Sequence, residues 1–211
     1  MEAMKPKSGI GVLGSQPQSG VRKPRIIVCV TGGRLLFSGV EVARGLVSLG
    51  CDVQIVLTME AAESVTPSAA EAFTNRKPVV DSRCGAGFDE VKINTGEWDV
   101  IVVVPATAYY IGRTAEEDEY GMVGGLVSGA DISVLFVPDS EHGMSVEVFR
   151  ENLKKLKERG YHVMTGLEIQ EVIDRVMYLA GLSAGRKACG GGGGGGHDTG
   201  SGEHGRKLRF P

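Results

Sequence analysis

Three short segments combine small residues with hydroxyl side chains, and each directly follows an apolar run. They are Thr31–Ser38, Thr58–Pro67 and Pro105–Tyr110. In the first, the pair Gly32-Gly33 lets the backbone turn tightly, so that its N–H groups and those of a following helix face one point. Such donors, at the positive end of a helix dipole, bind phosphate. The alternative is a glycine pair that only reverses the chain.

The elements around the first segment predict how it is held. Arg25–Val30 and Val53–Leu57 are apolar runs rich in β-branched residues, and the helical pattern between them ends at Gly50. A strand, a turn, a helix and a second strand form a parallel βαβ unit, whose crossover is almost always right-handed. The turn at Thr31 is therefore expected at the carboxyl edge of the sheet, where such folds bind ligands.

The rest of the chain continues the alternation of strands and helices. Further strands are expected at Asp99–Val104, Ile132–Val137 and His162–Met164, and helices at Ser68–Asn75, Val146–Glu158 and Leu167–Leu179. The segment between residues 75 and 94 is polar and is expected to be a loop. This order predicts an α/β protein with a parallel sheet between two helical layers, a three-layer Rossmann-like or flavodoxin-like fold. The three hydroxyl-bearing segments then meet at one sheet edge.

Length and composition predict a single core. The chain has 211 residues, of which 42% are hydrophobic, enough for one substantial domain. Residues 1–24 lack periodicity and are expected to form a flexible leader, so the domain spans residues 25–180. Residues 181–211 contain seven consecutive glycines, which lose much entropy on ordering and bury nothing, and are expected to be a disordered tail.

Charge and cysteine content narrow the partners. A formal net charge of −3 argues against nucleic-acid and membrane surfaces, and no apolar run reaches the roughly 20 residues of a spanning helix. The N-terminus lacks the apolar core of a secretory signal. The four cysteines form no CxxC pair, so reduced thiols are expected and no metal site is predicted. We expect a cytoplasmic protein.

Several ordered motifs resemble one family. TGGRLLFS (residues 31–38), LTMEAAESVTP (57–67), PATAYY (105–110) and NLKKLKERGYHV (152–163) are similar to segments of FMN-binding cysteine decarboxylases. That family includes phosphopantothenoylcysteine decarboxylases and the peptidyl-cysteine decarboxylases of lantibiotic pathways. The resemblance covers roughly Arg25 to Val163. It implies FMN at a subunit interface of a homo-oligomer (a trimer or a dodecamer) and a small-molecule or peptide substrate.

The resemblance implies a set of cofactor-binding residues. The matching positions are Thr31, Gly32, Gly33, Ser38, Thr58, Pro105, Ala106, Thr107, Ala108 and Tyr109. The glycine turn falls on the phosphate, and the segment from Pro105 falls beside the flavin ring. For Thr58 and Thr107 the alternative is a capping role at the end of a strand. The full G-x-G-x-x-G fingerprint and an acidic ribose-binding residue are both absent, so FMN is expected rather than FAD or NAD.

The catalytic positions of the family do not match. The region Asp89–Glu97 holds no histidine where the family has one, and Tyr109 replaces an asparagine. The family's P-x-M-N has become Pro138-Asp139-Ser140-Glu141, so an acid stands where a carboxamide would hold a substrate carboxylate. Like charges repel, so Glu141 should weaken cysteine binding. His142 is either a relocated base or a polar surface residue.

Two further features depend on the resemblance. Cys189 lies in an Ala-Cys-Gly segment like that of the family's substrate-covering flap, or it is an incidental cysteine of the glycine-rich tail. Tyr109 and Tyr110 replace small polar residues, and either narrow the pocket over the flavin or pack in an oligomer interface.

Three functions therefore remain open. The first is an FMN-dependent lyase or oxidoreductase that acts on a small or peptidyl thiol by decarboxylation or a redox step. The second is an FMN-dependent electron-transfer or reductase flavoprotein without decarboxylase activity, and the third is a non-catalytic flavin-binding subunit. Ordinary phosphopantothenoylcysteine turnover is expected to be slow or absent.

Overall fold

The computed structural model describes residues 22–81, 93–119, 121–139 and 144–189, with side chains described up to residue 181. Six parallel strands form one sheet in the order β3-β2-β1-β4-β5-β6. The strands are β1 (Arg25–Val30), β2 (Asp52–Leu57), β3 (Val79–Val80), β4 (Val100–Ala106), β5 (Ser133–Pro138) and β6 (His162–Val163). The fold class predicted from the sequence is confirmed.

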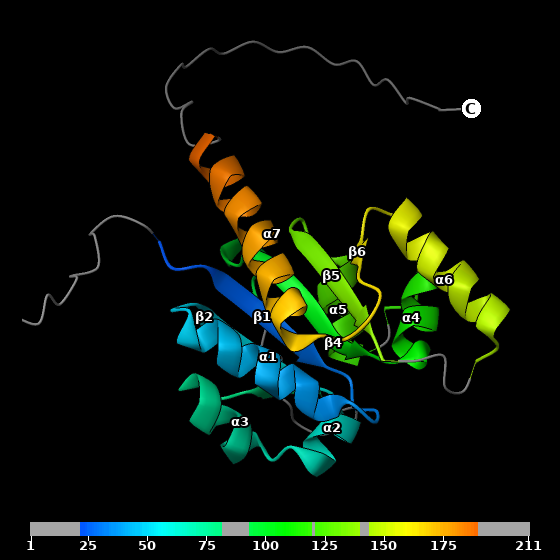
Figure 1. Cartoon of the computed structure of the whole chain (residues 1–211), viewed down its shortest axis with the longest axis horizontal. Helices are drawn as coiled ribbons and strands as arrows, with labels where there is room; N and C mark the ends of the chain where they lie inside the picture. Colours follow the sequence, from blue (N-terminus) through cyan, green and yellow to red (C-terminus); the bar gives the residue numbers. More distant parts are fainter. Residues whose placement is uncertain (1–21, 82–92, 120, 140–143, 190–211) are drawn as a thin grey trace, which may run out of the picture.

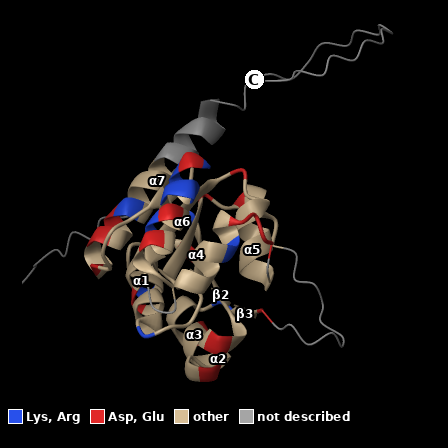
Figure 2. Cartoon of the chain, turned by 90° about the vertical axis from the view of Figure 1, so that its right-hand side faces the viewer, with Lys and Arg blue, Asp and Glu red and all other residues tan. Residues whose placement is uncertain are grey.

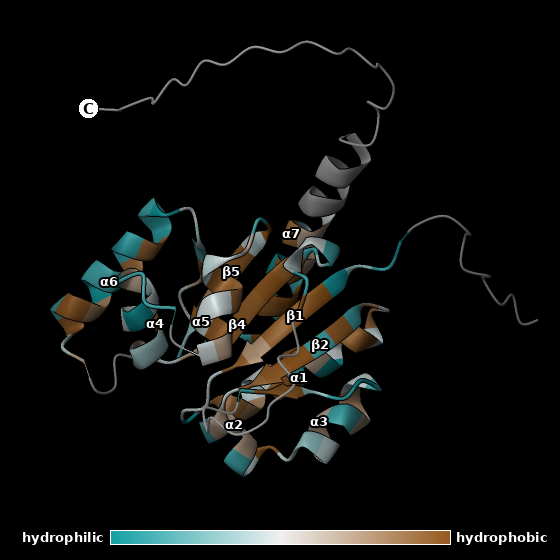
Figure 3. Ribbon diagram, turned by 180° about the vertical axis from the view of Figure 1, so that it is seen from behind, coloured by the Kyte–Doolittle hydropathy of each residue, from teal (hydrophilic) through white to brown (hydrophobic). Residues whose placement is uncertain are grey.

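Helices cover both faces of the sheet (Figure 1). They are α1 (Leu36–Ser48), α2 (Met59–Ser64), α3 (Pro67–Thr74), α4 (Ala108–Ala115), α5 (Gly121–Ser128), α6 (Val146–Glu158) and α7 (Ile169–Cys189), with a 3-10 turn η1 at Thr95–Glu97. One core cluster joins the sheet to α1, α2, α3 and α7, and a second joins it to α4, α5 and α6. Figure 3 shows that β1, β4 and β5 are hydrophobic along most of their length. Helices cover both faces of these strands, so the sequence of each strand is a nearly continuous apolar run.

The strand order places a topological switch point between β1 and β4. The chain moves outward from β1 to β2 and β3, then returns to the other side of β1 as β4 and continues to β5 and β6. The loops that follow β1 and β4 thus diverge to opposite faces of the sheet. In open α/β sheets, the crevice between two such loops is where ligands bind.

Some elements differ from the sequence-based expectation. Helices α2, α4 and α5 were not expected, and the predicted loop between residues 75 and 94 contains the short strand β3. The turn η1 follows directly after that segment. The closing helix α7 continues to Cys189, nine residues beyond the expected domain end at residue 180. Figure 1 shows α7 projecting past the edge of the sheet.

Helix α6 carries residues of both charge signs (Figure 2), and two ion pairs link it to the end of α4. Lys155 donates to Glu116 at 2.9 Å, and Arg159 lies 3.1 Å from Glu117. The hydrogen bond from Lys155 lowers the pKa of Glu116, and the same bond raises the pKa of Lys155. These exposed pairs orient α6 on α4 more than they stabilise the fold.

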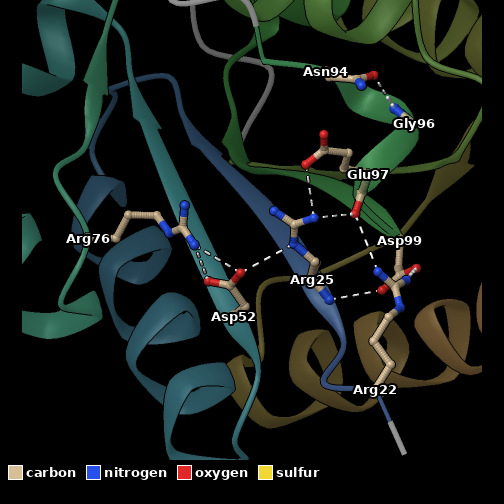
Figure 4. Close-up of polar contacts among 8 residues, drawn as sticks. All are labelled: Arg22, Arg25, Asp52, Arg76, Asn94, Gly96, Glu97 and Asp99. Atoms are coloured by element: carbon tan, nitrogen blue, oxygen red, sulfur yellow. Dashed lines mark hydrogen bonds and ion pairs between the residues drawn. The ribbon is translucent and has the colours of Figure 1, made fainter.

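The amino edge of the sheet is also held by charged groups (Figure 4). Arg25 donates to Asp52 at 3.3 Å and to Glu97 at 3.1 Å, while Arg76 donates to both oxygens of Asp52. Asp99 accepts from the backbone N–H of Arg25 at 2.9 Å. This cluster lies at the end of the sheet opposite to the switch point.

The described residues contain neither a membrane span nor a cluster of metal-binding side chains. No helix in that part of the chain is long and apolar enough to cross a membrane. No group of three or more His, Cys, Asp or Glu side chains among the same residues could hold a metal ion.

Candidate functional site

Thr31 joins the two loops of the switch point. It is fully buried at the end of β1, and its hydroxyl donates to the carbonyl oxygen of Pro105 at 2.8 Å. The Thr31 hydroxyl oxygen in turn accepts from the backbone N–H of Thr107 at 3.2 Å. The hydroxyl proton is therefore engaged within the protein, and Thr31 fixes the loop after β4 against the glycine turn.

The glycine turn has the conformation that the sequence predicts. Gly32 has φ of +84° and Gly33 has φ of +87°, values that side-chain-bearing residues rarely adopt. A Cβ atom added at Gly33 would lie 2.7 Å from Asp139 Oδ2 and 3.0 Å from Thr107 Cγ2. Only glycine allows the loops after β1, β4 and β5 to approach this closely.

Helices α1 and α4 begin at the switch point without a side-chain cap. Leu35 precedes α1 and Thr107 precedes α4, and neither side chain accepts from the first helical N–H groups. By contrast, Thr58, Thr66 and Ser145 cap α2, α3 and α6. Uncapped helix N-termini leave N–H donors available to an anion, so the two helices at the switch point differ from the three elsewhere.

Two other expected cofactor residues lie near the turn. Thr58 is buried, and its oxygen accepts from the N–H of Ala61 at 3.3 Å, so the capping alternative for this residue is observed. Its hydroxyl hydrogen can still donate. Ser38 is half-buried in the first turn of α1, and its backbone N–H donates to Leu35 at 2.9 Å.

The segment at the end of β4, expected beside the flavin ring, is mostly buried. Pro105 is buried and follows Val104 through a cis peptide bond, while Ala106 and Ala108 are 0% and 4% exposed. Both alanines pack in the core beneath α4. Thr107 is half-buried, so of these four residues it has the most accessible side chain.

Tyr109 and Tyr110 lie in different environments. Tyr110 is 2% exposed and packs in the core among α4, α5 and α6, so the expectation that it narrows a ligand pocket is wrong for this residue. Tyr109 is 46% exposed, with the guanidinium of Arg113 5.6 Å from its ring centre. It lines a groove of about 540 Å³ between α4 and α6, together with Met144 and Asn152. Adjacent residues of a helix point to different sides, which explains the split.

The three predicted catalytic residues are not placed in the site. Glu141 and His142 lie outside the described residues. Cys189 is the last residue of α7, and its side chain is not described. Their catalytic roles remain predictions from the sequence.

Two acidic residues border the turn, and the sequence did not identify them as site residues. A Cβ atom at Gly32 would lie 3.3 Å from Glu60 Cβ, and one at Gly33 would touch the Asp139 carboxylate. Asp139 directly follows β5. Its position at the carboxyl edge of the sheet is the sequence feature that could have identified it as a site residue. Glu60 lies in the first turn of α2, where a negative charge is favourable for the helix itself.

The described cysteines are not part of this chemistry. Cys29 and Cys51 are buried and free. Burial raises the pKa of the Cys29 thiol to about 12, and burial also raises the pKa of Cys51. A buried thiol that stays protonated is a poor nucleophile.

The backbone of the site suits a phosphate. Backbone N–H donors come from the two successive glycines with positive φ and from the uncapped start of α1. No acidic side chain in the first turn of α1 competes for these donors. The carboxylates of Glu60 and Asp139 at the border oppose an anion. The geometry of the cradle therefore fits the phosphate of a mononucleotide, and the bordering charges weaken that fit.

A doubly wound parallel sheet with a glycine turn at its switch point defines a nucleotide-binding α/β protein. The chain matches the Flavoprotein family over residues 15–181, and it belongs to that family. The family recognised from the sequence motifs is confirmed, and membership supports a flavin as the cofactor.

Relatives of known function are similar over part of their length. The coenzyme A biosynthesis bifunctional protein CoaBC of Vibrio vulnificus is 30% identical over 170 residues, which are 79% of this chain and 38% of that protein. CoaBC of Bacillus subtilis is 25% identical over 139 residues, 64% of this chain and 34% of that protein. The chain thus spans less than two fifths of the length of these relatives.

Solved structures share the fold. The FMN-dependent cysteine decarboxylase TvaF from thioviridamide biosynthesis superposes with a TM-score of 0.60 at 24% identity, covering 78% of this chain and 99% of that chain. AnUbiX in complex with FMN and dimethylallyl pyrophosphate gives a TM-score of 0.55 at 16% identity, covering 78% and 95%.

Proposed function

We propose that the protein binds FMN at the edge between β1 and β4 and uses it in a decarboxylation or redox step on a small or peptidyl thiol. The observation that carries the proposal is the turn at Gly32 and Gly33, where two positive-φ glycines meet the loop after β4. One cradle for one phosphate favours a mononucleotide over a dinucleotide, and β2 ends at Leu57, followed by Thr58, without an acidic residue in the usual ribose-binding place. The FMN-dependent decarboxylases with this fold support the choice.

The residues of the site have separate tasks under this proposal. The N–H groups of the turn and of the start of α1 bind the phosphate, and Thr31 holds that turn to Pro105. Thr107, half-buried beside the turn, presents a hydroxyl to the ligand. Bound FMN supplies a two-electron acceptor, which these side chains alone do not provide.

A second function is supported by the altered catalytic motifs. Tyr109 and Glu141 stand where cysteine decarboxylases have asparagine, and the residue range 89–97 contains no histidine. These changes favour an electron-transfer or reductase flavoprotein, or a flavin-binding subunit, over ordinary cysteine decarboxylation. We further propose a homo-oligomer, because the sequence motifs resemble those of FMN-binding cysteine decarboxylases, and that resemblance implies one.

The cofactor is tested by titration of the purified, flavin-free protein with FMN. Saturable binding is expected, and Gly33→Asp should lower the affinity at least about 100-fold, since it adds volume and negative charge at the cradle. Gly160→Asp is the matched control, because Gly160 has the same φ of +87° and no atom within 4 Å of its added Cβ. A wild-type protein that takes up no FMN would overturn the proposal.

The reaction is tested with the FMN-loaded protein. Carbon dioxide release from a peptide that ends in cysteine, or from phosphopantothenoylcysteine, would establish a decarboxylase. Reversible reduction of the bound flavin without carbon dioxide release would instead support the electron-transfer alternative.

A further inference from the structure

Asp139 is held against the phosphate cradle by the backbone of β5. Its N–H donates to the carbonyl oxygen of Ala106 at 3.1 Å, which continues the pairing of β5 with β4 past Pro138. This bond fixes the Asp139 backbone beside the loop after β4. The carboxylate then points across to the glycine turn, where Oδ2 lies 2.7 Å from the position of a Cβ at Gly33.

No neighbour among the described residues neutralises the carboxylate of Asp139. Within the described segments it forms no ion pair and accepts no hydrogen bond, and the side chain is half-buried. Glu60 adds a second acid of the same sign beside Gly32, with Oε2 3.7 Å from the position of a Cβ there. The basic residue nearest to Gly33 in the sequence is Arg34, which directly follows it and is exposed.

A phosphate in the cradle would lie close to this charge. An oxygen that accepts from the Gly33 N–H at the usual ~2.9 Å cannot be farther than about 8 Å from Asp139 Oδ2. That is less than the Debye length of about 10 Å at 0.1 M salt, so salt screens the repulsion between the two charges only in part. A phosphate monoester carries about −1.5 to −2 charges at neutral pH.

We propose that Asp139 is a specificity-determining residue whose negative charge weakens the binding of the flavin's phosphate. The affinity for FMN then exceeds the affinity for riboflavin by less than it would without this charge. The inference rests on the proposed function, because it requires a flavin in this cradle. Riboflavin has the same ring system and sugar chain as FMN but no phosphate. The ratio of the two affinities therefore isolates the interaction at the cradle from that at the ring.

The test compares FMN and riboflavin binding by fluorescence quenching in four proteins. Asp139→Asn removes the charge at constant shape, and Asp139→Ala removes the same charge and the volume. Glu63→Gln is the control, since Glu63 is exposed on α2 and gives the same change in net charge. We expect both Asp139 variants to raise the preference for FMN over riboflavin by roughly tenfold, and Glu63→Gln to change it less than twofold.

The outcomes separate the two proposals. If the wild type binds flavins but the ratio stays unchanged in both Asp139 variants, or shifts equally in Glu63→Gln, the role of Asp139 is wrong and the proposed function stands. If neither flavin binds to the wild type or to any variant, the proposed function is overturned, and the inference with it.

Discussion

Cys29 shows how burial controls the chemistry of a single residue. It lies in β1 three residues before Gly32, close to the candidate site along the chain. Its side chain faces the core shared with α4, α5 and α6, and it is fully buried. Since water cannot solvate a thiolate there, the pKa is raised to about 12. A nucleophilic role for this cysteine is excluded by its surroundings rather than by its position in the sequence.

The pKa of Cys29 predicts a pH dependence of stability. The folded-state pKa lies above the unfolded value of 9.0, so the contribution is complete below pH 9 and is lost as the pH rises toward 12. The free energy of unfolding should fall by about 1.4 kcal/mol per pH unit more in the wild type than in Cys29→Ala. Urea unfolding at several pH values between 9 and 11 measures this difference. Identical slopes in the two proteins would contradict it.

At the scale of elements, apolar runs were sufficient to predict the long strands. The expected Arg25–Val30 is β1 as observed, and Val146–Glu158 is α6 with the same bounds. Strands with both faces buried must be apolar at every position, so their sequence signal is strong. Helix α5 gave no such signal because its sequence, GMVGGLVS, contains three glycines, and its formation depends on packing against β4 and β5.

The candidate site was predictable only where backbone conformation determines the residue. Gly32 and Gly33 need positive φ, so their role could be inferred from the sequence. Asp139 could not be placed in the same way, because its approach to Gly33 depends on how β5 is positioned two strands away. The burial of Tyr110 likewise depends on the packing of α4 against α5 and α6.

Gly39 determines how closely α1 packs on the sheet. A Cβ atom there would collide with the carbonyl oxygen of Val104 and lie 2.8 Å from Val30 Cγ2. Gly39→Ala should therefore lower the free energy of unfolding by about 1–3 kcal/mol, as expected for an overpacked interface. Because α1 begins at the glycine turn, FMN affinity should fall as well.

The same substitution at Gly125 is the matched control. Gly125 lies in α5 with no atom within 4 Å of an added Cβ. Gly125→Ala should raise the free energy of unfolding by about 0.5–1 kcal/mol, since alanine favours a helix over glycine. Chemical denaturation measures both variants. Equal effects at the two positions would show that close packing of α1 is not the cause.

At the scale of the whole molecule, the two edges of the sheet carry different kinds of contact. The carboxyl edge has the glycine turn, two uncapped helices and the carboxylates of Glu60 and Asp139, neither of which forms an ion pair with another described residue. The amino edge has the paired charges around Arg25 (Figure 4). The Arg25 guanidinium also lies 4.7 Å from the ring centre of Trp98. Strands of six residues separate the edges by roughly 20 Å. Stability and ligand binding are thus expected to respond to mutations at different ends.

Asp99 provides the sharpest test of this separation. Its side chain is 2% exposed and binds both the guanidinium of Arg22 and the backbone N–H of Arg25. Asp99→Ala would leave that buried N–H without its acceptor, so the free energy of unfolding should fall by about 2 kcal/mol. Glu97→Ala removes a carboxylate that is 58% exposed and should cost no more than about 0.5 kcal/mol. FMN affinity should be unchanged in both folded variants, because the cradle lies at the opposite edge. If Asp99→Ala weakened FMN binding several-fold at a temperature where it is fully folded, the two edges would be coupled through the sheet, and the division of tasks argued here would be wrong.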